Sequence, residues 1–173
     1  MPKKRVFADT NVVIEAFRTG CWTAICDRYD VETVEKCVEE ALTGNPGDPR
    51  YVAIPPADLN AGIARRHSVT RSEIASLVLA YSSCATLDDG DKHLLARLYA
   101  DQALPSLLLV VSTADKAALV AGHQLGWLDF LVSLEDLARQ AGVSNIKLEA
   151  LYLQYREDWL VSIKTKIRMG IIP

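Results

Sequence analysis

Arg5-Val6-Phe7-Ala8-Asp9-Thr10-Asn11-Val12-Val13-Ile14 is the stretch of sequence that decides the fold. Residues 6–8 are consecutive apolar strand formers, which is typical of a parallel strand buried on both faces. Asp9 falls at the carboxyl end of that strand, where open α/β sheets place their ligands. We expect Thr10 or Asn11 to cap the following helix, because their short side chains can accept hydrogen bonds from free backbone N–H groups. The alternative is that Asp9 is only a helix cap. Whether it belongs to a binding site therefore depends on where the other acids of the chain lie.

Length and composition are those of an ordinary globular protein. The chain has 173 residues, of which 50% are hydrophobic and 24% charged, and this suits one domain with a sizeable core. The longest apolar run, residues 107–111, is too short to span a membrane. The basic start at residues 1–5 is not followed by an apolar signal-peptide core. The sequence therefore predicts a cytoplasmic protein with no membrane partner.

The charged residues give no strong signal for a nucleic-acid partner. The net charge is −3, so no overall positive field attracts phosphate. Arg65, Arg66 and Arg71 form a local basic cluster that could contact RNA phosphates, although a solvated face is the more common role of such a cluster. The four cysteines form no CxxC pair and the three histidines are scattered, which argues against a zinc site and a histidine-based catalytic set.

Apolar periodicity predicts strands that alternate with helices, which favours a parallel α/β sandwich. Thr70 and Glu73 form a capping-box pattern at the start of one helix. A weakly amphipathic stretch covers residues 59–66. The predicted strands are 6–8, 29–33, 107–111 and 128–132, and the predicted helices include 12–18, 34–42, 70–81, 91–99, 116–125, 134–141 and a long tail helix at 146–167.

Acidic residues recur at strand ends and helix starts: Asp9, one of the pair Glu39–Glu40, Asp91 and Asp115. Because parallel strands share a direction, Asp9 and Asp115 should emerge at the same edge of the sheet. Converging carboxylates repel one another unless one is protonated or a cation lies between them. Mg²⁺ or Mn²⁺ prefers such oxygen ligands, and it can activate water and clamp a phosphodiester. Asp88 and Asp89 are interpreted as plain turn residues.

Four segments, residues 6–11, 33–43, 87–92 and 110–116, resemble in sequence and in order the PIN-domain nucleases, a family that includes the VapC-type toxins of bacterial toxin–antitoxin pairs. The resemblance covers about residues 5–142. It implies a PIN-like three-layer α/β/α sandwich with a central parallel sheet over residues 1–143. Residues 144–173 are then a C-terminal helical extension that packs on the same domain or on a partner.

The resemblance also implies an activity, which is the metal-dependent hydrolysis of RNA around one or two Mg²⁺ or Mn²⁺ ions. Carried over by position, Asp9 and Asp91 would be metal ligands, and Asp115 would bind the ion directly or through water. Thr113 would orient the cluster, and Asn11 would position the site from behind the ligands. An antitoxin protein and a second copy of the chain, in a homodimer, are the partners that the family implies.

The second acid of the set is either Glu40 or Glu39. Cys37 and Val38 lie three and two residues before Glu40, and Thr43 lies three after it, as in the family's pattern. Glu40 is therefore preferred, with Glu39 as the alternative. The two are about 100° apart around a helix, so only one of them should face the other acids.

Two other functions compete with that of a ribonuclease. A phosphatase of the haloacid-dehalogenase type also begins with a strand and an aspartate, but it requires a second aspartate where this chain has Asn11. A catalytically inactive scaffold would keep the fold and bind metal without turnover. The chain has no Gly-rich phosphate loop, which argues against a P-loop or dinucleotide-binding role.

Overall fold

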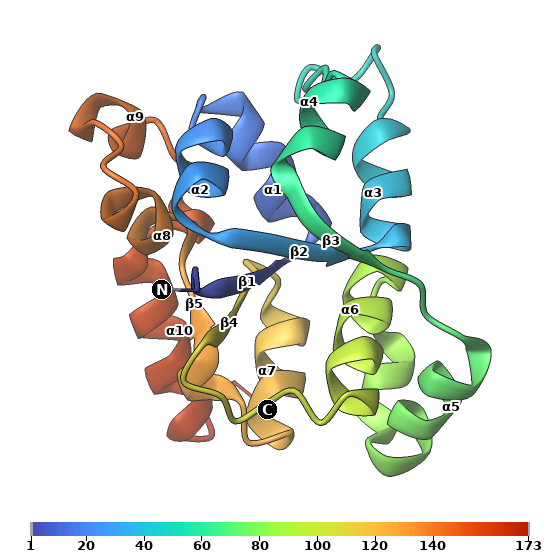
Figure 1. The fold of residues 1–173 in the computed structure, drawn as a ribbon. Coiled ribbons are helices and arrows are strands. Elements are labelled where there is room, and N and C mark those ends of the chain that lie inside the picture. The colour runs from blue at the N-terminus through green and yellow to red at the C-terminus, as the bar shows by residue number, and fades with distance from the viewer. Residues whose placement is uncertain (1, 173) are drawn as a thin grey trace.

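A five-stranded, all-parallel sheet with the strand order β3-β2-β1-β4-β5 forms the centre of the molecule (Figure 1). The computed structural model describes residues 2–172, so Met1 and Pro173, at the outer ends of the two predicted segments, lie outside it. The elements are β1 (Arg5–Ala8), α1 (Thr10–Arg18), α2 (Trp22–Arg28), β2 (Asp30–Val34), α3 (Glu35–Leu42), α4 (Pro56–Gly62), β3 (Ile63–His67), α5 (Arg71–Ala80), η1 (Ser82–Thr86), α6 (Asp89–Ala100), β4 (Leu109–Ser112), α7 (Lys116–Gln124), η2 (Leu128–Phe130), β5 (Leu131–Val132), α8 (Leu134–Gln140), α9 (Asn145–Glu149), η3 (Leu153–Tyr155) and α10 (Glu157–Arg168).

Strand β1 lies in the middle of the sheet and is buried on both faces, as its run of apolar residues predicts. It pairs with β2 on one side and with β4 on the other. Successive side chains of a strand point to opposite faces. Val6 and Ala8 accordingly belong to one hydrophobic core, whereas Phe7 belongs to the other.

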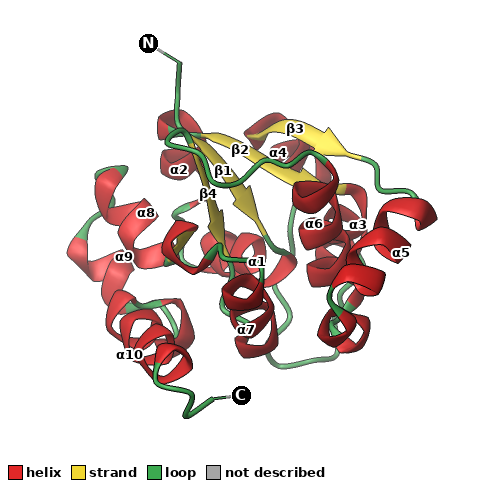
Figure 2. Ribbon diagram, turned by 90° about the horizontal axis from the view of Figure 1, so that it is seen from below, coloured by secondary structure: helices red, strands yellow, loops and turns green. Residues whose placement is uncertain are grey.

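Helices cover both faces of the sheet, an arrangement compatible with a three-layer sandwich. Figure 1 shows α1, α2 and α4 above the sheet and α5, α6 and α7 below it, and Figure 2 shows the strands side by side between the helices. The first core includes apolar residues of α1, α2 and α8, and the second includes those of α6, α7 and α10. The predicted parallel α/β class is confirmed. Within the described residues, no helix is both long and apolar enough to cross a membrane.

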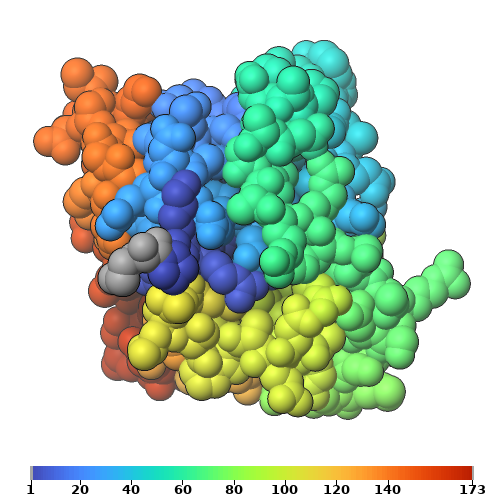
Figure 3. Space-filling model, in the orientation of Figure 1, coloured from blue at the N-terminus to red at the C-terminus, as the bar shows by residue number. Residues whose placement is uncertain are grey.

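Residues 59–66 are not one amphipathic stretch, because α4 ends at Gly62 and β3 follows at once. This edge strand lies at the molecular surface (Figure 3). It is held by the buried Glu32 of β2, whose carboxylate contacts the His67 ring nitrogen at 2.7 Å and the Arg5 guanidinium at 2.6 Å. The His67 ring also stacks on Phe7, at 5.1 Å between centroids. These contacts join residues that are distant in sequence, so the apolar periodicity of the sequence does not predict them.

Three predicted boundaries are wrong. The predicted strand at 128–132 is the 3-10 helix η2 followed by the two-residue strand β5. Strand β4 begins at Leu109, where it pairs with Arg5 of β1, whereas Leu107 and Leu108 are 94% and 53% exposed. The predicted single tail helix at 146–167 is three separate helices, α9, η3 and α10. The apolar residues of the tail are shared between the two cores, with Leu148, Leu151 and Tyr155 in the first and Leu160, Ile163 and Ile167 in the second. One straight helix cannot pack its apolar residues into both cores, which lie on opposite faces of the sheet, so the chain changes direction between α9 and α10.

Candidate metal centre

Asp9 links the central strand to the first helix. It has an extended backbone, and its Oδ1 accepts a hydrogen bond from the N–H of Val12 at 2.7 Å, which caps α1. The prediction that Thr10 or Asn11 is the cap is therefore wrong, because the helix already begins at Thr10. The second oxygen, Oδ2, is buried and has no hydrogen-bond partner among the described residues. Capping of α1 thus occupies Oδ1 only and leaves Oδ2 without a hydrogen-bond partner among the described residues.

The unpartnered oxygen makes the charged form of Asp9 costly. The residue is only 2% exposed, and burial is the main cause that raises its pKa to about 6. The Thr113 hydroxyl and the Val12 N–H act in the opposite direction, and the negative charge of Asp115 raises the pKa further. A buried carboxylate oxygen without a partner carries a large desolvation penalty, which a nearby cation would remove.

Three other acids converge beside Asp9. One carboxylate oxygen from each of Asp88, Asp91 and Asp115 lies within 4.8 Å of the other two. Asp91 is 8% exposed and its pKa is raised to about 8, first by burial and then by the charges of Asp9 and Asp115, followed by Asp88 and Glu40. Asp88 is exposed and Asp115 partly buried, so Asp91 is the buried member of the three. Carboxylates this close favour a proton or a cation among them.

The prediction that Asp88 and Asp89 are plain turn residues is wrong for Asp89, which begins α6, and incomplete for Asp88. It precedes α6, and within the described part of the chain its side chain makes no capping hydrogen bond. Its carboxylate is therefore available to the acidic group. The signal in the sequence was the spacing to Asp91, because residues three apart at a helix start lie on the same side. By contrast, Asp115 resembles Asp9, since its Oδ1 caps α7 through the N–H of Ala118 at 2.9 Å.

Asp9, Asp88 and Asp91 border a cavity of about 580 Å³, whose described lining does not include Asp115. Glu40 faces this cavity, and its Oε2 accepts a hydrogen bond from the Thr10 hydroxyl at 2.7 Å. Glu39 is exposed on another side of α3 and pairs with Lys36 at 3.3 Å. The geometry therefore brings Glu40, and not Glu39, to the other acids. The cavity-lining residues are Asp9, Thr10, Asn11, Ile14, Glu40, Leu87, Asp88, Asp89, Gly90 and Asp91.

The remaining predicted site residues fall into two groups. Asn11 is exposed at the cavity rim, and Thr113 is buried, where its hydroxyl accepts the N–H of Asp115 at 3.2 Å. Arg65 and Arg66 are exposed on the edge strand β3, and Arg71 begins α5. The described residues that line the cavity do not include these three arginines. The basic cluster and the acids thus occupy separate places.

Gly90 is required for the position of Glu40. A Cβ atom at Gly90 would lie 2.5 Å from Glu40 Oε2 and 2.9 Å from the Thr10 hydroxyl oxygen. Gly90→Ala should therefore displace the Glu40 carboxylate and weaken Mn²⁺ binding, by about tenfold if one hydrogen bond to a charged group is lost. The fold should not suffer, since Ala is a better helix former than Gly by ~1 kcal/mol.

Isothermal titration with Mn²⁺ and thermal unfolding of the same samples test this prediction. Gly122→Ala is unsuitable as a control, because its Cβ would meet buried Leu131 at 2.8 Å. Ala61→Ser, at an exposed site of α4, is a suitable control. Unchanged Mn²⁺ affinity in Gly90→Ala would show that the position of Glu40 has no effect on the metal.

The geometry is that of an acidic, partly buried oxygen site at the carboxyl edge of a parallel sheet. Such a site suits a hard divalent cation. Comparison of the chain with protein-family models, with curated proteins and with solved structures gives no match.

Proposed function

We propose that this protein is a ribonuclease that depends on Mg²⁺ or Mn²⁺ and has a PIN-like fold. The observation that carries the proposal is the buried, unpartnered Oδ2 of Asp9, a residue that lines the same cavity as Asp88 and Asp91. A site with this much unneutralised carboxylate is costly to fold without a cation. The order of the motifs along the chain, which resembles that of the PIN-domain nucleases, supports RNA as the substrate.

The residues present fit a divalent ion. Asp88, Asp91 and Asp115 would hold it through one oxygen each. Asp9, whose Oδ2 has no partner among the described residues, lines the same cavity as Asp88 and Asp91. When bound, such an ion lowers the pKa of a water molecule and offsets charge on a phosphodiester. Hard carboxylate ligands suit Mg²⁺ and Mn²⁺ better than a softer metal.

The chain itself supplies orientation around that ion. The Thr10 hydroxyl donates a hydrogen bond to Glu40 Oε2 and so fixes the orientation of the Glu40 carboxylate at the cavity wall. Asn11 is exposed at the rim, where its amide N–H groups can donate to a phosphate oxygen. Helix capping by Asp9 and Asp115 fixes both carboxylates to rigid elements.

Cleavage of a mixed pool of labelled single-stranded and structured RNAs tests the proposal. Cutting should occur with Mn²⁺ or Mg²⁺ and stop when EDTA removes the metal. The exposed-site variant Asp58→Asn, in which an acid outside the cavity loses its charge, should cut like the wild type. Cleavage that persists in EDTA would rule out the metal-dependent mechanism. Tight Mn²⁺ binding without cleavage of any RNA would instead support the inactive scaffold.

A further inference from the structure

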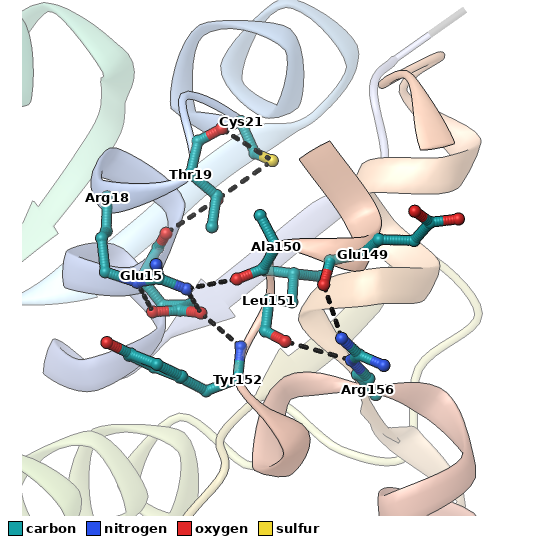
Figure 4. Close-up of polar contacts among 9 residues, drawn as sticks. All are labelled: Glu15, Arg18, Thr19, Cys21, Glu149, Ala150, Leu151, Tyr152 and Arg156. Atoms are coloured by element: carbon teal, nitrogen blue, oxygen red, sulfur yellow. Dashed lines mark hydrogen bonds and ion pairs between the residues drawn. The ribbon is translucent and has the colours of Figure 1, made fainter. Parts of the chain in front are cut away.

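The tail of the chain is docked on α1 by a polar network that the metal centre does not use (Figure 4). Glu15 is buried, and its carboxylate accepts hydrogen bonds from the Arg18 guanidinium at 2.6 and 2.7 Å and from the N–H of Tyr152 at 2.8 Å. Arg18 also donates to the carbonyl of Ala150 at 2.6 Å. Lys147 donates to the carbonyl of Gly20 at 2.9 Å, just past the end of the helix.

This network holds Tyr152 in a fixed position. The Arg18 guanidinium carbon lies 3.9 Å from the centroid of the Tyr152 ring, which is close cation–π stacking. Arg156 donates to the carbonyls of Glu149 and Leu151 and so fixes the turn that carries the ring. Tyr152 is nevertheless 49% exposed. With Arg18 on one face, the ring presents a preorganised aromatic surface to solvent.

The position of this ring relative to the metal centre follows from helix geometry. Asn11 lies at the cavity rim and Arg18 lies seven residues later on α1. Seven residues are about 20° short of two full turns, so the two side chains lie on the same side of the helix, ~10 Å apart along its axis. Ile14, between them, also lines the cavity. A continuous strip of α1 therefore leads from the acids to Tyr152.

We propose that Tyr152 is a base-stacking platform for the RNA strand that leaves the metal centre along α1. The inference rests on the proposed ribonuclease function and adds a substrate-binding residue to it. A π-face held in place can stack on any base, and each such contact is worth about 1–3 kcal/mol. Glu15 neutralises Arg18, so the arginine positions the ring rather than attracting phosphate.

RNA binding by the full-length protein tests this role independently of cleavage. The Asp9→Asn variant with Mg²⁺ serves as the background, and the probe is a fluorescein-labelled single-stranded RNA of mixed sequence, followed by anisotropy. In this background Tyr152→Ala should raise the Kd by ~10-fold, whereas Tyr152→Phe, which keeps the ring, should stay within about twofold. Tyr51→Ala removes another exposed tyrosine, which is 38% exposed and outside the cavity lining, and should have no effect.

A cycle with abasic RNA separates stacking from a structural role. Probes that carry one abasic nucleotide at successive positions identify the base whose removal weakens binding to the parent protein, which keeps Tyr152. Removal of that same base should cause no further loss of RNA affinity in Tyr152→Ala. If Tyr152→Ala melts at a much lower temperature, Tyr152→Leu replaces it, because Leu keeps apolar packing over Arg18 but has no π-face.

The outcomes distinguish the two proposals. Equal RNA affinity of Tyr152→Ala and its parent would overturn the platform. Equal abasic penalties in both proteins would also overturn it. RNA binding that depends on Tyr152, in a wild type that never cleaves RNA, would reject the ribonuclease and keep the platform. In a protein that does cleave, the same substitution should raise KM and leave kcat unchanged.

Discussion

Asp9→Asn should reduce RNA cleavage at least ~10³-fold, because a metal-held charge is worth several kcal/mol in such a transition state. Asn can replace Asp as the cap of α1, since its Oδ1 can still accept the N–H of Val12. The substitution therefore removes the charge of the unpartnered oxygen and keeps the local geometry. Initial rates with Mn²⁺, measured beside the wild type, give the size of the loss.

Stability measurements on the same variant separate loss of charge from loss of fold. Without metal, Asp9→Asn should melt at the same temperature as the wild type or higher, since a buried carboxylate no longer has to be desolvated. Asp58→Asn provides the matched control at an exposed acid. A variant that melts normally and still cleaves at the wild-type rate would remove Asp9 from the catalytic site.

The metal-free protein should be more stable near about pH 5 than near about pH 8. The folded state raises the pKa of Asp9 to about 6 and that of Asp91 to about 8, from the ordinary aspartate pKa of 3.8. For each residue, at a pH between its unfolded and its folded pKa, the folded protein binds more protons than the unfolded chain. This contribution to stability is complete below the unfolded pKa and is lost as the pH rises through the folded values.

Divalent cations should reverse that trend. Each unit of pKa shift corresponds to about 1.4 kcal/mol, so we expect the metal-free protein to melt at least ~5 °C lower at the higher pH. Mn²⁺ should restore the loss there and act weakly at the lower pH, where protons compete for the same oxygens. Thermal unfolding in EDTA and in Mn²⁺ at both pH values tests this. A variant that carries both Asp9→Asn and Asp91→Asn should lose most of the difference.

A metal-free protein that is equally stable at both pH values, with its acids intact, would contradict the prediction. So would an equal effect of Mn²⁺ in the wild type and in the double variant, because the ion would then bind elsewhere. These experiments need no RNA. They test the metal centre even if the substrate is not RNA.

The sequence by itself determined the central strand, most of the helices and the edge of the sheet at which Asp9 and Asp115 emerge. These features follow from local causes. An apolar run predicts a buried strand, the capping box of Thr70 and Glu73 is present as predicted, and parallel strands direct their carboxyl ends to one side. Each can be inferred from residues that are close together in the chain.

Only the tertiary structure decided which acids meet. Glu40 rather than Glu39 faces the cavity because of the rotation of α3 about its axis, which packing against α1 and α6 fixes. Asp88 joins Asp91 and Asp115 because α6 begins where β4 ends in space, although their positions in sequence are far apart. The docking of Tyr152 on Glu15 joins residues 137 apart. Contacts of this kind depend on the packing of the whole chain, so local patterns of apolar and polar residues in the sequence do not predict them.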